Sequence, residues 1–127
     1  MLDLDHFKSS NDLYGHHSGD CVLQYIAKLL TDSFRKTNIV CRLCGDELSL
    51  FIGNCRDISA IEYKISNIIL CYSEMIQEKY PKSLSSISCG GVYGQRKTSF
   101  EELYQAADKV LYEVKNGGRG SYRFRPL

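Results

Sequence analysis

The sequence lacks the marks of three protein classes: nucleic-acid binders, membrane proteins and secreted proteins. Its 16 basic and 15 acidic side chains leave a net charge of only +1, without the basic excess that a nucleic-acid or anionic-membrane surface needs. No uninterrupted apolar run is long enough to cross a bilayer. No signal peptide opens the chain, because Asp3, Asp5 and Lys8 lie where its apolar stretch would be. We therefore expect a cytoplasmic domain with no nucleic-acid partner and no membrane contact of its own, in a parent protein that can itself be membrane-tethered.

The sequence also lacks the cysteine spacing of a zinc site. Cys41 and Cys44 form one C-x-x-C pair, but no second pair completes a set of four ligands. Most of the cysteines lie in apolar or alternating segments, which is typical of small buried side chains in a reducing compartment. We favour this interpretation over a disulfide framework for all six cysteines: Cys21, Cys41, Cys44, Cys55, Cys71 and Cys89.

The length of 127 residues, with 43% hydrophobic side chains and neither an internal repeat nor a linker, indicates one small domain. Apolar alternation and apolar residues at helical spacing predict its elements. Strands are expected over residues 1–5, 39–43, 48–52, 86–93 and 121–125, and helices over residues 20–35, 58–80 and 99–116. Residues 6–19 are rich in polar and turn-forming residues, so at most one or two helical turns are expected there.

This order of elements predicts an α+β fold with a mainly antiparallel central sheet and helices covering one face. Residues 44–47 form the turn of a hairpin. The last helix begins at a capping box, Ser99 to Glu102, and ends at Asn116, where the two following glycines can take the left-handed conformation. The first strand and the hairpin tip are possible neighbours in such a sheet.

Four carboxylates lie at these two places. Asp3 and Asp5 share one face of the first strand, and Asp46 and Glu47 lie in the hairpin turn. Oxygen ligands of this kind suit Mg²⁺, which is commonly held by one or two carboxylates together with substrate phosphates. Acidic residues are also common in solvated turns and strand edges. Spacing alone favours that second interpretation.

Three separated blocks of the sequence match one family. They are LDLDHFKSSNDLYGHHSGD at residues 2–20, RLCGDEL at 42–48 and ADKVLYEVKNGGR at 107–119. In this order they resemble the opening block, the signature hairpin, and the closing helix with its phosphate loop of GGDEF domains, the diguanylate cyclases of bacteria. The resemblance covers nearly the whole chain, which is therefore expected to be one GGDEF-type domain over residues 1–127. Family members begin with a further helix and an Asp-x-Leu-Thr segment, so the domain is expected to be truncated at its amino terminus.

The resemblance implies a fold similar to nucleotidyl cyclases and polymerase palms, which is ferredoxin-like. It implies condensation of two GTP into cyclic di-GMP and two pyrophosphates by metal-assisted attack of a 3′-hydroxyl on an α-phosphate. The domain would work as a homodimer with two Mg²⁺ or Mn²⁺ ions per active site. The carboxylates of Asp3 and Asp46 and the carbonyl of Leu4 would hold metal, with Asp46 accepting the hydroxyl proton and Glu47 assisting.

The resemblance also implies a substrate site. Asn11 and Asp20 would bind guanine, whose N1–H and amino group suit a carboxylate acceptor, and His16 and Gly45 would be further substrate contacts. Lys8, Lys115 and Arg119 would contact phosphates, Lys8 taking part in catalysis. Four of these residues also have an ordinary structural role: Asn11 suits a turn, Asp20 suits a first helical turn, and Lys115 and Arg119 suit a helix carboxyl terminus. These alternatives stay open.

The sequence departs from the family at two sites. Its signature reads Cys-Gly-Asp-Glu-Leu, so Cys44 replaces the first glycine and Leu48 the phenylalanine. Arg35 and Asn38 stand where the family's inhibitory site has an Arg-x-x-Asp pair, and Asn38 lacks the charge of that aspartate. The sequence therefore leaves open a second hypothesis: a catalytically degenerate domain that binds GTP or cyclic di-GMP as a regulatory or interaction module.

Overall fold

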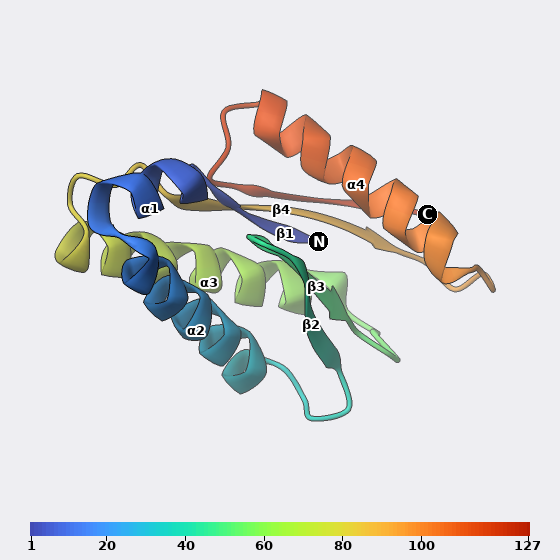
Figure 1. Ribbon diagram of the computed structural model, residues 1–127. Coiled ribbons are helices and arrows are strands. Elements are labelled where there is room, and N and C mark those ends of the chain that lie inside the picture. The colour runs from blue at the N-terminus through green and yellow to red at the C-terminus, as the bar shows by residue number, and fades with distance from the viewer.

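The computed structural model describes residues 1–127 as one sheet with four helices (Figure 1). In chain order the elements are β1 (Leu2–Asp5), α1 (Phe7–Tyr14), α2 (His16–Ser33), β2 (Ile39–Cys44), β3 (Glu47–Phe51), α3 (Ile58–Lys79), β4 (Ser86–Tyr93), α4 (Phe100–Asn116) and β5 (Tyr122–Pro126). The strand order across the sheet is β2-β3-β1-β4-β5. The first and shortest strand thus lies at the centre, antiparallel to β3 on one side and to β4 on the other.

The predicted fold class is confirmed. Three of the four strand pairs are antiparallel, and only β4 and β5 run parallel. The parallel pair follows from the topology, because α4 forms the crossover between two strands of the same sheet. The predicted strands match the observed ones to within one or two residues, and the hairpin turn lies at Gly45 and Asp46.

Helices cover both faces of the sheet, which corrects the expectation that they cover one. In Figure 1, α2 and α3 lie below the sheet and α4 lies above it. Alternation along β4 separates the two layers, with Ile87 and Cys89 in the core shared with α2 and α3. On the other face, a Cβ at Gly90 would lie 2.2 Å from the backbone nitrogen of Leu111. Gly90 therefore permits the close approach of α4, which no hydrophobic spacing could predict.

The main core lies between the sheet and the helices α2 and α3. Leu2 and Leu4 of β1 are fully buried there against Ile26, Ile65 and Tyr72. Each such side chain stabilises the fold by roughly 1.5–3 kcal/mol. Because Leu2 and Leu4 point into this core, Asp3 and Asp5 point to the opposite face, under α4.

The prediction for residues 6–19 is wrong. Residues 7–14 form the complete helix α1, and α2 begins at His16 rather than at Asp20. Gly15, with φ of 91°, separates the two helices in a conformation that favours glycine. The sequence predicts a turn because Ser, Asn and Asp favour turns, but these residues form a short packed helix, in which Lys8, Ser9 and Asp12 are exposed and Ser10 is buried. His16 and Asp20 therefore share one face of α2, one turn apart.

The predicted burial of the cysteines is also wrong for most of them. Only Cys89 is buried; Cys21, Cys41 and Cys71 are half-buried, and Cys44 and Cys55 are exposed. The reason is placement, since Cys41 and Cys44 lie on the edge strand β2 and Cys55 lies in the loop after β3. All six are free thiols. None of the helices has the length and apolar character needed to span a membrane.

Both ends of α4 follow the sequence prediction. The Ser99 hydroxyl accepts a hydrogen bond from the Glu102 amide, and the Glu102 carboxylate accepts one from the Ser99 amide, which is a complete capping box. After Asn116 the chain turns through three residues with positive φ: Gly118 at 117°, Arg119 at 63° and Gly120 at 60°. We call residues 117–120 the α4–β5 loop.

Candidate active site

Strand pairing brings the hairpin tip to the middle of the sheet. The Leu4 amide donates a hydrogen bond of 3.1 Å to the Asp46 carbonyl, and Asp3 pairs with Glu47 across β1 and β3. Gly45 makes the tight turn possible with its φ of 48°, and its carbonyl accepts a 2.7 Å hydrogen bond from Arg42 Nε. The acids at the two ends of a forty-residue separation are thus neighbours.

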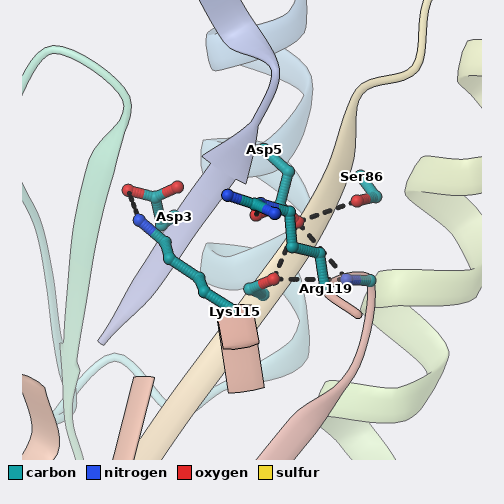
Figure 2. Close-up of polar contacts among 7 residues, drawn as sticks. Asp3, Asp5, Ser86, Lys115 and Arg119 are labelled. Carbon is teal, nitrogen blue, oxygen red and sulfur yellow. Dashed lines mark hydrogen bonds and ion pairs between the residues drawn. The ribbon is translucent and has the colours of Figure 1, made fainter. Parts of the chain in front are cut away.

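Asp3 lies at the centre of this arrangement. It is only 6% exposed, and Lys115 Nζ of α4 lies 2.9 Å from its Oδ2 (Figure 2). Burial raises the pKa of Asp3, the ion pair with Lys115 opposes that rise, and the negative charges of Asp46 and Asp5 add to it. The surroundings of Asp3 therefore concentrate the negative charges of three carboxylates, and the ammonium group of Lys115 stabilises them.

The donor set fits a hard cation that is shared with a substrate. No three side chains of the His, Cys, Asp and Glu types gather closely enough to hold a metal alone. Asp3 and Asp46 offer two carboxylates, the number that Mg²⁺ commonly uses when phosphates and water complete its shell. Lys115 against Asp3 shows that a positive charge is favourable at this point. Glu47 is half-buried at the start of β3, beside the same pair.

The α4–β5 loop lies on the same side of β1. Figure 2 shows Lys115 reaching Asp3 and Arg119 reaching Asp5, two residues further along the strand. Arg119 Nε lies 3.7 Å from Asp5 Oδ1, while its side chain keeps 47% of its surface exposed. Of the three cations assigned to phosphates, Lys115 is therefore adjacent to the proposed metal carboxylate Asp3 and Arg119 to Asp5, whereas Lys8 is an exposed residue of α1.

The sequence groups Asp5 with Asp3, Asp46 and Glu47 as a possible metal carboxylate, but the resemblance assigned it no role. It is fully buried and accepts hydrogen bonds from Ser86 and Ser88 of β4, two further residues that the sequence did not single out. The available signal was the alternation of β1, which places Asp5 on the same face as Asp3. The serines gave no signal, because only the sheet register brings β4 beside β1.

The residues assigned to guanine lie around the junction of α1 and α2. Asn11 on α1 faces Gly19, where a Cβ would lie 2.2 Å from the Asn11 Oδ1. That oxygen is buried and accepts no hydrogen bond. Asp20 follows Gly19 directly and is exposed, as are His16 and Lys8. The structure thus brings Asn11 and Asp20 to one place, with Asp20 exposed and the Asn11 Oδ1 buried against Gly19.

Arg35 and Asn38 lie elsewhere, between α2 and β2. The Asn38 amide donates a 2.9 Å hydrogen bond to the Arg35 carbonyl, and both residues line a cavity of about 500 Å³ together with Arg56 and Lys64. A larger cavity, about 900 Å³, lies at the Met1 end of β1, and neither Asp3 nor Asp46 lines it. Cavity size alone therefore does not identify the carboxylate site, which lies on the central strand β1 beside the tip of the β2–β3 hairpin.

The sequence matches the family model "Diguanylate cyclase, GGDEF domain" over residues 1–121. The chain belongs to the GGDEF domain family. Two curated relatives are 32% identical to it: diguanylate cyclase DgcS of Shewanella oneidensis over 99% of this chain, and diguanylate cyclase A of Treponema denticola over 94%. The chain spans 41% and 32% of the lengths of these two proteins.

Solved GGDEF domains have the same fold. The GGDEF domain of DgcB from Caulobacter crescentus, determined in complex with c-di-GMP, superposes on 97% of this chain with a TM-score of 0.84 and 25% identity, and the match covers 74% of that domain. A GGDEF domain from Pseudomonas aeruginosa superposes with a TM-score of 0.80 and 28% identity, over 97% of this chain and 73% of that one.

The GGDEF signature explains why Cys44 is compatible with the hairpin. Of the first two signature positions, Gly45 has the left-handed φ, whereas Cys44 does not and ends the strand β2 with its side chain exposed. A side chain at the first position therefore adds no backbone strain. Leu48 is buried in the core at 3% exposure, where one apolar side chain replaces another.

Proposed function

We propose that this chain is the catalytic domain of a diguanylate cyclase, which condenses two GTP into cyclic di-GMP and two pyrophosphates. The observation that carries the proposal is the pairing of β1 with β3, which sets Asp3 beside Asp46 with Lys115 at 2.9 Å. Nucleotidyl transfer needs carboxylates and cations on one surface, because the attacking hydroxyl loses a proton while the leaving pyrophosphate carries negative charge.

The residues divide the work by their chemistry. Asn11 and Asp20 bind guanine, and His16 and Gly45 line the nucleotide. Lys8, Lys115 and Arg119 bind and orient the triphosphate, so that the α-phosphate faces the incoming 3′-hydroxyl. Asp46 accepts the proton of that hydroxyl, and Glu47 assists at the same edge.

Two Mg²⁺ or Mn²⁺ ions per site, held by the carboxylates of Asp3 and Asp46 and the carbonyl of Leu4, would neutralise phosphate charge and lower the pKa of the hydroxyl when bound. Lys115 exchanges Asp3 for a phosphate oxygen as the substrate arrives. Both partners are anionic, so Lys115 stays paired throughout this exchange.

The reaction requires two copies of the domain. Each copy holds one GTP, and each 3′-hydroxyl attacks the α-phosphate held by the other copy. The proposed partner is therefore a second copy of this chain in a two-fold homodimer, which gives both half-reactions the same geometry.

The test is to incubate the purified protein with GTP and Mg²⁺ and to resolve the products by chromatography. We expect cyclic di-GMP and pyrophosphate from the wild type, and a loss of at least about a hundredfold in Asp46→Ala, which lacks the proton acceptor and one metal carboxylate. Asp32→Asn, an exposed acid on the last turn of α2, is the matched control. If the wild type forms neither cyclic di-GMP nor pyrophosphate, the proposal is refuted. If Asp46→Ala stays active, the role of Asp46 is refuted.

A second function rests on a specific observation. The lining of the 500 Å³ cavity carries three positive side chains, Arg35, Arg56 and Lys64, and one carboxylate, Asp57. The net positive charge suits the two phosphates of cyclic di-GMP. With Cys44 in the signature, the alternative is a degenerate domain that binds GTP or cyclic di-GMP and regulates a partner. Calorimetric binding of cyclic di-GMP that is lost in Arg35→Ala, together with no turnover of GTP, would establish this alternative.

A further inference from the structure

The buried carboxylate of Asp5 joins three parts of the chain. Its Oδ2 accepts hydrogen bonds of 2.7 Å from both Ser86 and Ser88 of β4, and one of 3.4 Å from the Gly120 amide. The Ser88 hydroxyl also accepts a 3.2 Å hydrogen bond from that amide. Asp5 on β1 is thus connected to the α4–β5 loop both directly and through Ser88. Figure 2 shows Asp5 between Ser86 and Arg119.

The second oxygen of Asp5 faces Arg119. Oδ1 is buried, accepts no hydrogen bond, and lies 3.7 Å from Arg119 Nε. No hydrogen bond engages the Arg119 guanidinium in return, so its N–H groups remain available to another anion. A buried carboxylate carries a large desolvation cost, and an unpartnered buried oxygen adds to it. This cost is offset by the contacts through which the Asp5 carboxylate holds the α4–β5 loop.

The loop that it holds has an unusual backbone. Gly118, Arg119 and Gly120 all have positive φ, and Arg119 adopts at 63° a left-handed conformation that is unfavourable for a non-glycine residue. Inside the loop, the Arg119 amide donates a 3.2 Å hydrogen bond to the Val114 carbonyl at the end of α4. The Asp5 contact with Gly120 fixes the other side of Arg119, so the residue is held from both of its neighbours.

We propose that Asp5 is the positioning residue of a phosphate site in the α4–β5 loop: it fixes Gly120 and orients Arg119 so that Arg119 and Lys115 together face a polyphosphate. The inference rests on the proposed function for the origin of that polyphosphate, the triphosphate of GTP. Asp5 itself touches no phosphate. It acts through the loop backbone and through Arg119.

The sign of the effect separates positioning from simple electrostatics. Asp5 carries a negative charge close to the proposed anion, so its removal would strengthen anion binding if charge alone mattered. Positioning predicts the opposite, because a loosened loop must be ordered when the anion binds.

The experiment titrates inorganic tripolyphosphate into the wild type, Asp5→Asn and Asp5→Ala by calorimetry, with melting temperatures recorded for each. Asp5→Ala is expected to weaken binding by about ten- to a hundredfold, the range of one or two hydrogen bonds to a charged group. Asp5→Asn keeps an acceptor for Ser88 and Gly120 but loses the charge facing Arg119, so its loss is smaller. Asp32→Asn removes an exposed carboxylate of α2 that pairs only with Lys28, and it is the matched control, with near-wild-type affinity.

A double-mutant cycle with Arg119→Ala distinguishes positioning of Arg119 from a general structural role of Asp5. It compares the effect of Asp5→Asn on tripolyphosphate affinity with and without the Arg119 side chain. Part of the Asp5 effect passes through Arg119, so Asp5→Asn is expected to weaken tripolyphosphate binding less in the Arg119→Ala background than in the wild type. Equal losses in the two backgrounds would overturn that part of the proposal.

The remaining outcomes are distinct. Tighter or unchanged binding in Asp5→Asn would overturn the inference, and so would a wild type that does not bind tripolyphosphate. If Asp5→Ala does not fold, Asp5→Asn decides. A wild type that shows the expected tripolyphosphate losses but forms no cyclic di-GMP from GTP would refute the proposed function and leave the phosphate site standing.

Discussion

At the scale of single residues, the site is built from carboxylates that are buried in pairs with cations. Asp3 is held by Lys115, and Asp5 by Arg119 and the serines of β4. Each residue type was visible in the sequence, but the partners were not, since they come from positions more than eighty residues away. The electrostatics of the site therefore belong to the fold rather than to any one motif.

The contact between Gly19 and Asn11 leads to a prediction about nucleotide recognition. A methyl group at position 19 would lie 2.2 Å from the Asn11 Oδ1, so Gly19→Ala must displace the Asn11 side chain. We expect the affinity for GTP to fall by about tenfold, the loss of one hydrogen bond, while the affinity for tripolyphosphate is unchanged. Calorimetry with both ligands checks this, and equal losses for the two would contradict a guanine role for Asn11.

Tyr72 gives a prediction for alkaline pH. Burial raises its pKa to about 12 in the folded protein, and its hydroxyl shares a 2.8 Å hydrogen bond with Ser85. Between pH 10 and pH 12 the unfolded chain releases this proton while the folded protein keeps it, so stability falls as the pH rises. The slope is about 1.4 kcal/mol per pH unit.

Urea unfolding of the wild type and Tyr72→Phe across this pH window measures the effect. Tyr72→Phe is expected to remove that part of the slope, whereas Tyr112→Phe, an exposed tyrosine of α4, is expected to keep it. An unchanged slope in Tyr72→Phe would show that other groups cause the alkaline loss.

At the scale of elements, α4 is the piece that completes the site. It covers the face of the sheet that carries Asp3 and Asp5, and it delivers Lys115 and the α4–β5 loop to them. Its amphipathic spacing and its capping box were predictable, but its placement on the face opposite α2 and α3 was not. That placement depends on Gly90 of β4, which leaves room for the backbone of α4.

Gly90→Ala tests this dependence. The new Cβ would lie 2.2 Å from the Leu111 backbone nitrogen, and backbone cannot move aside as a side chain can. We expect α4 to shift and the free energy of unfolding to fall by about 1–3 kcal/mol, measured in urea. Gly53→Ala, where a Cβ meets nothing within 4 Å, is the matched control. A variant as stable as the control would show that α4 is less tightly docked than this packing indicates.

At the scale of the whole molecule, we propose one nucleotide site for the domain, whereas the proposed product joins two nucleotides. Asp3, Asp46, Lys115 and Arg119 form a single cluster on one side of the sheet. A two-fold pair of chains would bring two such clusters face to face. The proposed reaction therefore requires the dimer, because each chain supplies one of the two sites.

Subunit mixing tests the assembly. In an equal mixture of wild type and Asp46→Ala, random pairing leaves about one quarter of the dimers with two intact sites. We expect cyclic di-GMP formation to fall to about that fraction and the linear intermediate to accumulate, both measured by chromatography. Activity at half of the wild-type level with no linear intermediate would indicate that each chain acts alone.

Local chemistry in the sequence determined the strands, the three long helices, the capping box of α4 and the hairpin turn, because these depend on neighbours within a few residues. The helix over residues 7–14 was not predicted, since short helices owe their stability to packing against the rest of the fold. The resemblance identified the family. Of the residues assigned through it, Asp3 and Lys115 form an ion pair in the structure.

Only the tertiary structure decided which of these residues meet. The register of β1 between β3 and β4 brings Asp3 to Asp46 and Asp5 to Ser86 and Ser88. The close approach of α4 over Gly90 then sets Lys115 and Arg119 against the two carboxylates. Spacing along the chain contains no information about such contacts, because hydrogen bonding across the sheet and packing between layers act between residues that are distant in sequence.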